Sequence, residues 1–326
     1  SALGRNALEA NTTGGDNTGM GTNSLLLNTT GCDNTAFGAD SLDSNTSADG
    51  NTAVGASSLP ANTTGASNTA VGKESLLANT TAGENTGIGF RSMCKTTTGC
   101  QNTAVGTNTM RANTTGDLNV AIGYRALDKN TTGDANVALG RDALCANTTA
   151  GLNVAIGSLA LSTSQTGGSM VAIGFCALSQ STGTGQSVAI GDRVLKTNTS
   201  GCLNTATGHT SMCDNTSGEC NTAYGASALK ANTTGDLNVA IGKDALLRST
   251  TADKSIAIGY NSLASSVTGT GNTAVGNQAL QQNTTNNNTA VGFCSMICTS
   301  TGASNTAMGC GALKLNTSGA ENTAIG

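Results

Sequence analysis

The sequence predicts an all-β fold, a parallel β-solenoid in which one short unit repeats along the whole chain. Three observations predict it. A glycine, usually closing an Ala-Val-Gly or Ala-Ile-Gly triplet, returns every 17 residues from Gly4 to Gly326, with a single interval of 16 before Gly292. Leu or Met stands four residues after the opening glycine in all nineteen units. The charged residues avoid both of these places. A fixed period of this length is the signature of a repeat architecture.

We number the unit 1 to 17 from the residue after each glycine. The consensus is x-x-(Ala/Ser)-Leu-x-x-Asn-Thr-Thr-Gly-x-x-Asn-(Thr/Val)-Ala-(Val/Ile)-Gly, and residues 124–140 are a clean copy of it. Because the phase never slips, we expect one continuous repeat array over residues 1–326 with no internal boundary. Nineteen coils about 4.8 Å apart predict a rod about 90 Å long.

The period and the turn residues select strands rather than helices. The apolar segments at positions 3–4 and 13–16 are too short for helices, and Gly-rich and Asn-rich turns separate them. Positions 14 and 16 share one face of the strand, and position 15 faces the other way. Stacked coils then form ladders of Leu, Val, Ala and Asn, which bury the apolar face that one coil cannot bury alone.

The charged residues mark the corners that we expect to face water. All 34 Asp, Glu, Lys and Arg residues fall at positions 1, 2, 5, 6, 11 or 12. An unpaired buried charge is too costly to keep, so we expect positions 1, 5 and 11 to be exposed and positions 4, 15 and 16 to be buried. On this map, Leu127→Asp disrupts the stacking, whereas Asp128→Ala, at position 5, is nearly silent.

Position 15 never holds a residue larger than Ala, from Ala2 to Ala324. A row of small side chains lets another backbone approach closely. That neighbour is either the opposite wall of the same narrow coil or a second chain, with position 15 or position 3 as the seam of a homotrimer.

The one short unit, which ends at Gly292, has Asn286-Asn287-Asn288 in place of Gly-x-x-Asn. Corners tolerate deletions, whereas a slipped strand turns its apolar face outward. We therefore expect the lost residue to belong to the corner at positions 10–12, and residues 289–291 to stay in the ladder with residues 273–275.

Position 7 is Asn in thirteen units, and Thr-Thr or Thr-Ser follows it each time, so each is an N-glycosylation sequon. The alternative is a polar ladder, because Asn also hydrogen-bonds its own turn. The ladder is favoured by two facts: the other six units carry Ser or Thr here, and position 13 is Asn in sixteen units without forming a sequon. The candidate glycosylation sites are Asn11, Asn28, Asn45, Asn62, Asn79, Asn113, Asn130, Asn147, Asn198, Asn215, Asn232, Asn283 and Asn316.

The eleven cysteines drift around the repeat. Cys94 and Cys100 flank one Thr-Thr-Gly loop, and Cys213 and Cys220 flank a Thr-Ser-Gly loop, so either pair is placed to close a disulfide across a corner. The sequence does not fix the pairing, and free surface thiols are the alternative. Two pairings between neighbouring coils compete with these, Cys202 with Cys220 and Cys294 with Cys310.

Composition argues against several classes of function. With a net charge of −4 the chain has no basic footprint for nucleic acid, and no apolar run approaches the roughly 20 residues of a membrane helix. The lone histidine, His209, stands at position 1 without the partners of a metal site or a Cys/His pair. We therefore expect no enzymatic activity, no cofactor, no metal site and no membrane insertion.

The element Asn-Thr-Ala-Val-Gly-x-x-Ala-Leu at residues 272–280 resembles the YadA-like head repeat of trimeric autotransporter adhesins. The form Asn-Val-Ala-Ile-Gly at residues 119–123, 153–157 and 238–242 is closer still, and similar runs occur in bacteriophage and large-virus tail-fibre proteins. The resemblance covers the whole chain. It implies a left-handed parallel β-roll, three chains side by side, and attachment to a host or another surface. Units in that family are commonly a few residues shorter, which indicates an enlarged Asn-Thr-Thr-Gly corner here.

We thus expect a structural segment of an extracellular fibre or adhesin, a stiff rod that displays its corner loops at a cell surface, on a virion or phage fibre, or in a secreted filament. The alternatives are a glycan-coated environmental or cell-surface filament subunit, and an ice-binding solenoid whose Thr ladders order water. The chain begins and ends at the same phase of the repeat without a polar cap, so we expect a longer chain or ends that join neighbours. The expected partners are copies of the chain, in a homotrimer or an end-to-end filament, and host surfaces or glycans.

Overall fold

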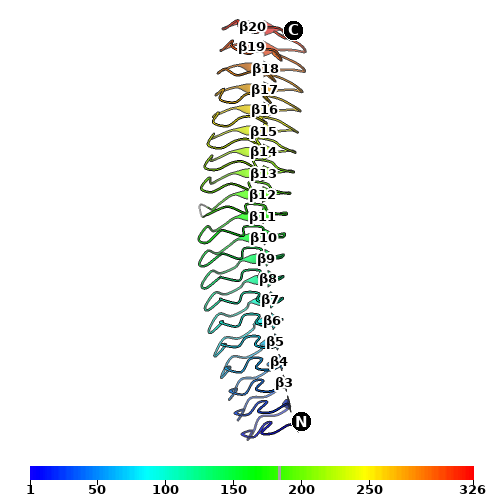
Figure 1. Ribbon diagram of the computed structural model, residues 1–326, viewed down its shortest axis with the longest axis vertical. Coiled ribbons are helices and arrows are strands. Elements are labelled where there is room, and N and C mark those ends of the chain that lie inside the picture. The colour runs from blue at the N-terminus through cyan, green and yellow to red at the C-terminus, as the bar shows by residue number, and fades with distance from the viewer. Residues whose placement is uncertain (183–184) are drawn as a thin grey trace. The chain divides into compact units, whose positions relative to one another are not determined.

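The computed structural model describes residues 1–182 and 185–326, and every regular element in them is a short parallel strand. No helix occurs in this described part. The chain divides into two compact units, Ser1–Thr166 and Gly167–Gly326. In each unit one repeat makes one coil and each coil carries one strand (Figure 1). The predicted all-β fold, a parallel β-solenoid with a 17-residue spacing, is therefore confirmed.

Within each unit, every strand pairs in register with the strand one repeat away, as Val120 does with Val137. The first unit contains β1 (Ala2–Leu3), β2 (Thr18–Met20), β3 (Thr35–Phe37), β4 (Thr52–Val54), β5 (Thr69–Val71), β6 (Thr86–Ile88), β7 (Thr103–Val105), β8 (Val120–Ile122), β9 (Val137–Leu139) and β10 (Val154–Ile156). The second unit contains β11 (Val171–Ile173), β12 (Val188–Ile190), β13 (Thr205–Thr207), β14 (Thr222–Tyr224), β15 (Val239–Ile241), β16 (Ile256–Ile258), β17 (Thr273–Val275), β18 (Thr289–Val291), β19 (Thr306–Met308) and β20 (Thr323–Ile325).

Left-handed backbone makes the corners tight. In most coils the residues at positions 2, 4 and 12 have positive φ, including the buried Leu127 at position 4 with a φ of 53°, a conformation that costs a non-glycine residue about 1–2 kcal/mol. Position 17 requires glycine. Gly55 has a φ of 130°, and a Cβ on it would lie 2.8 Å from the carbonyl carbon of Gly72 in the next coil. The recurring glycine is thus fixed both by its dihedral angles and by the close approach of stacked coils.

The core is a narrow column of Leu or Met at position 4, Ala or Gly at position 15, Ser, Thr, Ala or Val at position 3, and mostly polar side chains at positions 7 and 13. Position 15 faces the opposite wall of its own coil: a Cβ on Gly87 would lie 3.4 Å from Leu76 Cγ. The Ser58 hydroxyl, at position 3, joins the same two walls by donating to the carbonyl of Ala70 at 2.8 Å. The opposite-wall alternative is therefore confirmed. A seam between chains along position 15 or position 3 is wrong, because both rows are buried inside the coil.

Position 16 is not buried, and the prediction that it would be is wrong. It lies with position 14 on the outer face of the sheet, where Ile122 is 42% exposed and Tyr224 is 62% exposed. The reason is the alternation of side chains along a strand. Once Ala at position 15 faces the interior, its two strand neighbours must face outward.

The short unit keeps its strand in place, as predicted. β18 pairs with β17 in register, with Thr289 opposite Thr273 and Val291 opposite Val275. The carbonyl of Thr285 accepts the Asn272 amide at 2.7 Å. In full-length units the position-10 glycine carbonyl accepts this bond, as Gly31 does from Asn17 at 2.7 Å. The deletion therefore lies in the corner, because the Thr285 carbonyl accepts the hydrogen bond that the glycine carbonyl accepts in other units.

We predict that Ala104→Leu, at position 15, lowers the free energy of unfolding by about 1–3 kcal/mol, because the added methyl groups have no space against the facing wall. The matched control is Val105→Leu on the outer face, for which we expect a change within about 0.5 kcal/mol. Urea unfolding followed by circular dichroism measures both. Equal midpoints for the two variants would contradict the orientation of this strand.

Candidate functional site

The asparagines at position 7 form a ladder inside one corner of the coil. The amide nitrogen of Asn62 donates to Asn45 Oδ1 of the preceding coil at 3.0 Å and to the Gly65 carbonyl of its own turn at 2.9 Å. Asn130 makes the same two bonds, to Asn113 Oδ1 and to Gly133. Both amide hydrogens are used, so the predicted polar ladder is confirmed.

This ladder decides how accessible the sequons are. The asparagine is buried in eleven of the thirteen, namely Asn28, Asn45, Asn62, Asn79, Asn113, Asn130, Asn147, Asn198, Asn215, Asn232 and Asn283. Asn11 and Asn316 are partly exposed. Glycosylation requires the amide nitrogen at the surface. Folding therefore opposes modification of these eleven asparagines, and glycosylation stays a prediction at all thirteen sequons, with Asn11 and Asn316 the more accessible within residues 1–326.

The ladder is interrupted where Ser or Thr replaces Asn. Asn79, Asn147 and Asn232 are each the last asparagine before such a coil, and the buried Oδ1 of each accepts no hydrogen bond. The buried hydroxyl that follows, such as that of Thr96, is also without a partner. The shorter side chain does not reach the neighbouring coil. Each interruption thus leaves unpaired polar atoms in the interior, which costs stability.

A second asparagine ladder, at position 13, ties the start of each strand to the Thr-Thr-Gly corner. Asn17 Nδ2 donates to the carbonyl of Gly31 at 2.7 Å, and its Oδ1 accepts the backbone amide of Asn34 at 3.0 Å. The threonine at position 8 also bonds the following coil: Thr12 Oγ1 donates to the carbonyl of Thr29 at 2.9 Å. Polar side chains therefore hold the corners together from coil to coil.

All eleven cysteines are free thiols in the structure, including both candidate pairs, Cys94 with Cys100 and Cys213 with Cys220. Within each pair the two residues stand at different corners, position 5 and position 11 or 12. Cys94 contacts the carbonyl of Arg111 in the next coil instead, with Sγ at 3.6 Å. Burial raises the pKa of the Cys94, Cys145 and Cys213 thiols, which keeps them in the neutral, unreactive form.

The corner at positions 1, 2, 5 and 6 and the corner at positions 11 and 12 carry net charges of opposite sign. Positions 1, 2, 5 and 6 hold fourteen Lys and Arg against nine Asp and Glu, whereas positions 11 and 12 hold ten Asp and Glu against Lys254. Acidic residues at position 11 accept backbone amides of the preceding coil, as Asp134 Oδ1 does from Asp117 at 2.8 Å. Asp236 Oδ1 does the same for the amide of Glu219 at 2.7 Å. The acidic corner is thus part of the coil-to-coil bonding.

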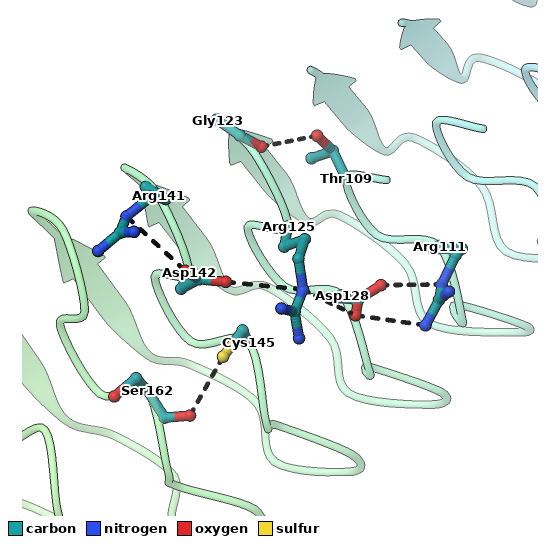
Figure 2. Close-up of polar contacts among 9 residues, drawn as sticks. All are labelled: Thr109, Arg111, Gly123, Arg125, Asp128, Arg141, Asp142, Cys145 and Ser162. Carbon is teal, nitrogen blue, oxygen red and sulfur yellow. Dashed lines mark hydrogen bonds and ion pairs between the residues drawn. The ribbon is translucent and has the colours of Figure 1, made fainter. Parts of the chain in front are cut away.

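In the first unit, a chain of ion pairs runs along the corner formed by positions 1, 2, 5 and 6 (Figure 2). Asp128 lies between Arg111 and Arg125, whose Nε atoms are 3.1 and 3.6 Å from its oxygens. Asp142 lies between Arg125 and Arg141, at 3.6 and 3.8 Å. Asp128 is only 1% exposed. The prediction of an exposed position 5 is wrong in most coils, where this residue is buried or half-buried. Pairing with two arginines makes the burial of the Asp128 charge possible, so we now expect Asp128→Ala to lower stability.

Two hollows adjoin these ion pairs. One, of about 290 Å³, is lined by Asn108, Arg111, Tyr124, Arg125 and Asp128. The other, of about 350 Å³, is lined by Glu74, Leu77, Arg91, Cys94, Lys95 and Arg111. They share Arg111 and draw on four successive coils. We did not identify this cluster from the sequence. One signal was present: Arg111 is followed 17 residues later by Asp128 at the same position of the unit, and Arg125 is followed in the same way by Asp142.

A smaller group of ionisable side chains lies in the second unit, where Arg193 Nε is 3.4 Å from an oxygen of Asp192. His209 lies 3.3 Å from an oxygen of Asp192, and its side chain is 62% exposed. In residues 1–182 and 185–326, no group of three or more His, Cys, Asp and Glu is arranged to bind a metal ion. Over the same residues, no helix has the length and apolar character needed to cross a membrane.

No protein-family model, curated protein or solved structure matches this chain. The resemblance to adhesin head repeats therefore depends on the repeat motif itself. Functional inference has to come from the surfaces that the coils present.

We predict that Thr96→Asn raises the free energy of unfolding by about 1–2 kcal/mol, because it supplies the missing donor to Asn79 Oδ1 and continues the ladder towards Asn113. Thr98→Asn, two residues away in the exposed corner, is the matched control and should change stability by less than about 0.5 kcal/mol. Chemical denaturation of protein made in bacteria, which lack this glycosylation, measures both. A lower stability for Thr96→Asn would refute the ladder argument.

We also predict that residues 1–326, secreted from a eukaryotic cell, carry glycans at Asn11 or Asn316 rather than at the eleven buried asparagines. Glycopeptide mass spectrometry reads the occupancy of each sequon. Extensive occupancy at Asn62 or Asn130 would mean that modification precedes folding and that the ladder does not form there.

Proposed function

We propose that the chain is a structural segment of an extracellular fibre or filament, a stiff support that presents its corners and outer sheet face for contact. The observation that supports this most directly is the bonding between coils. Strand, corner and asparagine ladders each join a coil to its neighbours, as the bonds of Asn17 and Thr12 illustrate. A coil held at several points opens only by breaking all of them, which raises the cost of local unfolding.

The environment of three partly buried thiols fits a mechanical role. Burial raises the pKa of the Cys94, Cys145 and Cys213 thiols, so these cysteines are poor nucleophiles. Among the described residues, most of the buried polar side chains are engaged in the coil-to-coil bonds described above. The proposal therefore assigns no catalytic step to this chain.

We propose that copies of the chain associate through the outer sheet face rather than along position 15. In the first unit, Ile122 and Ile156 of β8 and β10 are 42% and 36% exposed, beside Val120 and Val154. In the second unit, Ile256 and Ile258 of β16 are 38% and 37% exposed. Aliphatic side chains repeated along a flat sheet mark an interaction surface. A homotrimer or a larger bundle would cover them.

We predict that the wild-type chain has a native mass of about three times, or a higher multiple of, 31.9 kDa and that Ile122→Lys with Ile156→Lys yields monomers, because each copy would place two charges in the interface. The matched control is Leu118→Lys with Leu152→Lys, in the same coils at the acidic corner, where the two leucines are 56% and 66% exposed. Native mass spectrometry separates the outcomes. A monomeric wild-type chain would end the proposal of self-association.

A second candidate function, an ice-binding solenoid, is favoured by one observation. Position 14 is Thr in each strand from β2 to β7, on the outward face, with Val beside it in β4, β5 and β7. The threonines of position 8 contribute less, because their hydroxyls donate to backbone carbonyls of the next coil. Thermal hysteresis at micromolar protein, lost on Thr69→Tyr and kept on Thr64→Tyr at the corner, would establish it. No hysteresis in the wild type would remove it.

A further inference from the structure

Positive charge is concentrated along one corner of the first unit. Between residues 73 and 141, positions 1, 2, 5 and 6 carry seven Lys and Arg and, with Asp142 included, three Asp and Glu, a local balance of +4 in a chain of net charge −4. The cations are Lys73, Arg91, Lys95, Arg111, Arg125, Lys129 and Arg141. A surface of this kind attracts anions locally while the molecule as a whole does not.

The acids of this corner lie beneath the cations. The side chains of Asp128 and Glu74 are 2% and 18% exposed, whereas those of Arg111, Arg125 and Arg91 are 45%, 40% and 48% exposed. Each of these arginines is paired through Nε. Arg111 also donates from one Nη atom to Asp128 Oδ2 at 3.4 Å, so its other Nη atom remains for a ligand. In the described residues, no protein group bonds the outer Nη atoms of Arg91 or Arg125. The buried carboxylates thus fix the guanidinium planes and leave outward N–H groups for a ligand, as the view of Arg125 in Figure 2 illustrates.

The arginines line hollows rather than an open ridge. We define the arginine groove as the two hollows that share Arg111, with volumes of about 290 and 350 Å³. It spans four coils, which is about 14 Å along the stacking direction at about 4.8 Å per step. This length suits a short oligosaccharide segment. It is too short for the many phosphate contacts on which non-specific binding of nucleic acid depends.

Aromatic and amide groups accompany the cations. The ring of Tyr124 is half-exposed and lines the groove together with Asn108. Phe90 is 41% exposed, and the Arg91 guanidinium lies 5.1 Å from the centre of its ring. A flat ring gives an apolar surface for the C–H face of a sugar, an amide binds hydroxyl groups, and paired N–H groups of arginine bind a carboxylate or sulfate in two contacts.

We propose that the arginine groove binds an acidic saccharide, with a carboxylate or sulfate held by Arg111 and Arg125 and a sugar ring packed on Tyr124. The proposal deepens the attachment role given above and rests on it for its biological context. Binding to the groove is measured separately from self-association, because none of its lining residues belongs to the outer sheet face. Failure of one therefore leaves the other standing.

The test is isothermal titration of the intact chain with three probes: a uronic-acid tetrasaccharide, a sulfated tetrasaccharide, and a neutral tetrasaccharide of the same linkage. We expect one or both acidic probes to bind and the neutral one to bind at least tenfold more weakly. The stronger acidic probe identifies carboxylate or sulfate as the preferred group. Failure of both acidic probes to bind, or equal affinity for the neutral one, would overturn the proposal.

Substitutions locate the site. Arg111→Gln with Asp128→Asn removes the shared guanidinium without leaving a buried carboxylate unpaired, and should weaken binding at least tenfold. Tyr124→Ser and Lys95→Gln alter exposed side chains and should also weaken it, with an unchanged unfolding midpoint. The control is Arg248→Gln, an exposed cation of the same corner in the second unit, which should leave affinity unchanged. An equal loss for Arg248→Gln, or equally tight binding of a single-stranded oligodeoxythymidylate, would reduce the effect to non-specific attraction and refute the assignment.

Discussion

The structure depends on one constraint: the asparagines buried in a coil rely on hydrogen-bond partners one repeat away. The Asn62 amide bonds Asn45 in the coil before it, and the Asn17 amide bonds the Gly31 carbonyl in the coil after it. In an ordinary domain, apolar packing dominates the interior. Here the apolar core of a coil is one Leu or Met at position 4, an Ala or Gly at position 15 and, in about half of the coils, an Ala at position 3, so the ladders must be nearly complete. The unpaired buried atoms of Asn79 and Thr96 show that each interruption of the asparagine ladder leaves polar groups without hydrogen bonds.

The same constraint explains where sequence variation is tolerated. A change at a ladder position acts on two coils at once, whereas the corner at positions 10–12 accommodates the loss of a residue. The short unit is the natural test, since its deletion falls in the corner and Thr285 supplies the carbonyl that Asn272 needs. Positions 1, 2, 5 and 6 also differ widely in residue type from coil to coil. The ion pairs of Asp128 and Asp142, and the arginine groove above them, formed at such positions.

The functions that we propose both depend on surfaces that the coils present. The outer sheet face carries aliphatic side chains suited to other copies of the chain. The arginine groove carries cations and an aromatic ring suited to an acidic saccharide. The two differ in origin: the sheet face recurs in every coil, because positions 14 and 16 must point outward, whereas the groove exists only where arginines occupy neighbouring coils.

By itself the sequence determined the coil, because the unbroken 17-residue phase fixes one repeating unit and the recurring glycine, with its positive φ, sets a turn at the same place in each. It also placed the deletion in the right corner and favoured the polar ladder over exposed asparagines. Only the tertiary structure decided which way each strand faces: Ala121 inward and Ile122 outward, a choice that alternation alone leaves open until the opposite wall is known. It likewise decided that Asp128 is buried, since the fate of a charge depends on partners such as Arg111, one coil away in space but seventeen residues away in the chain.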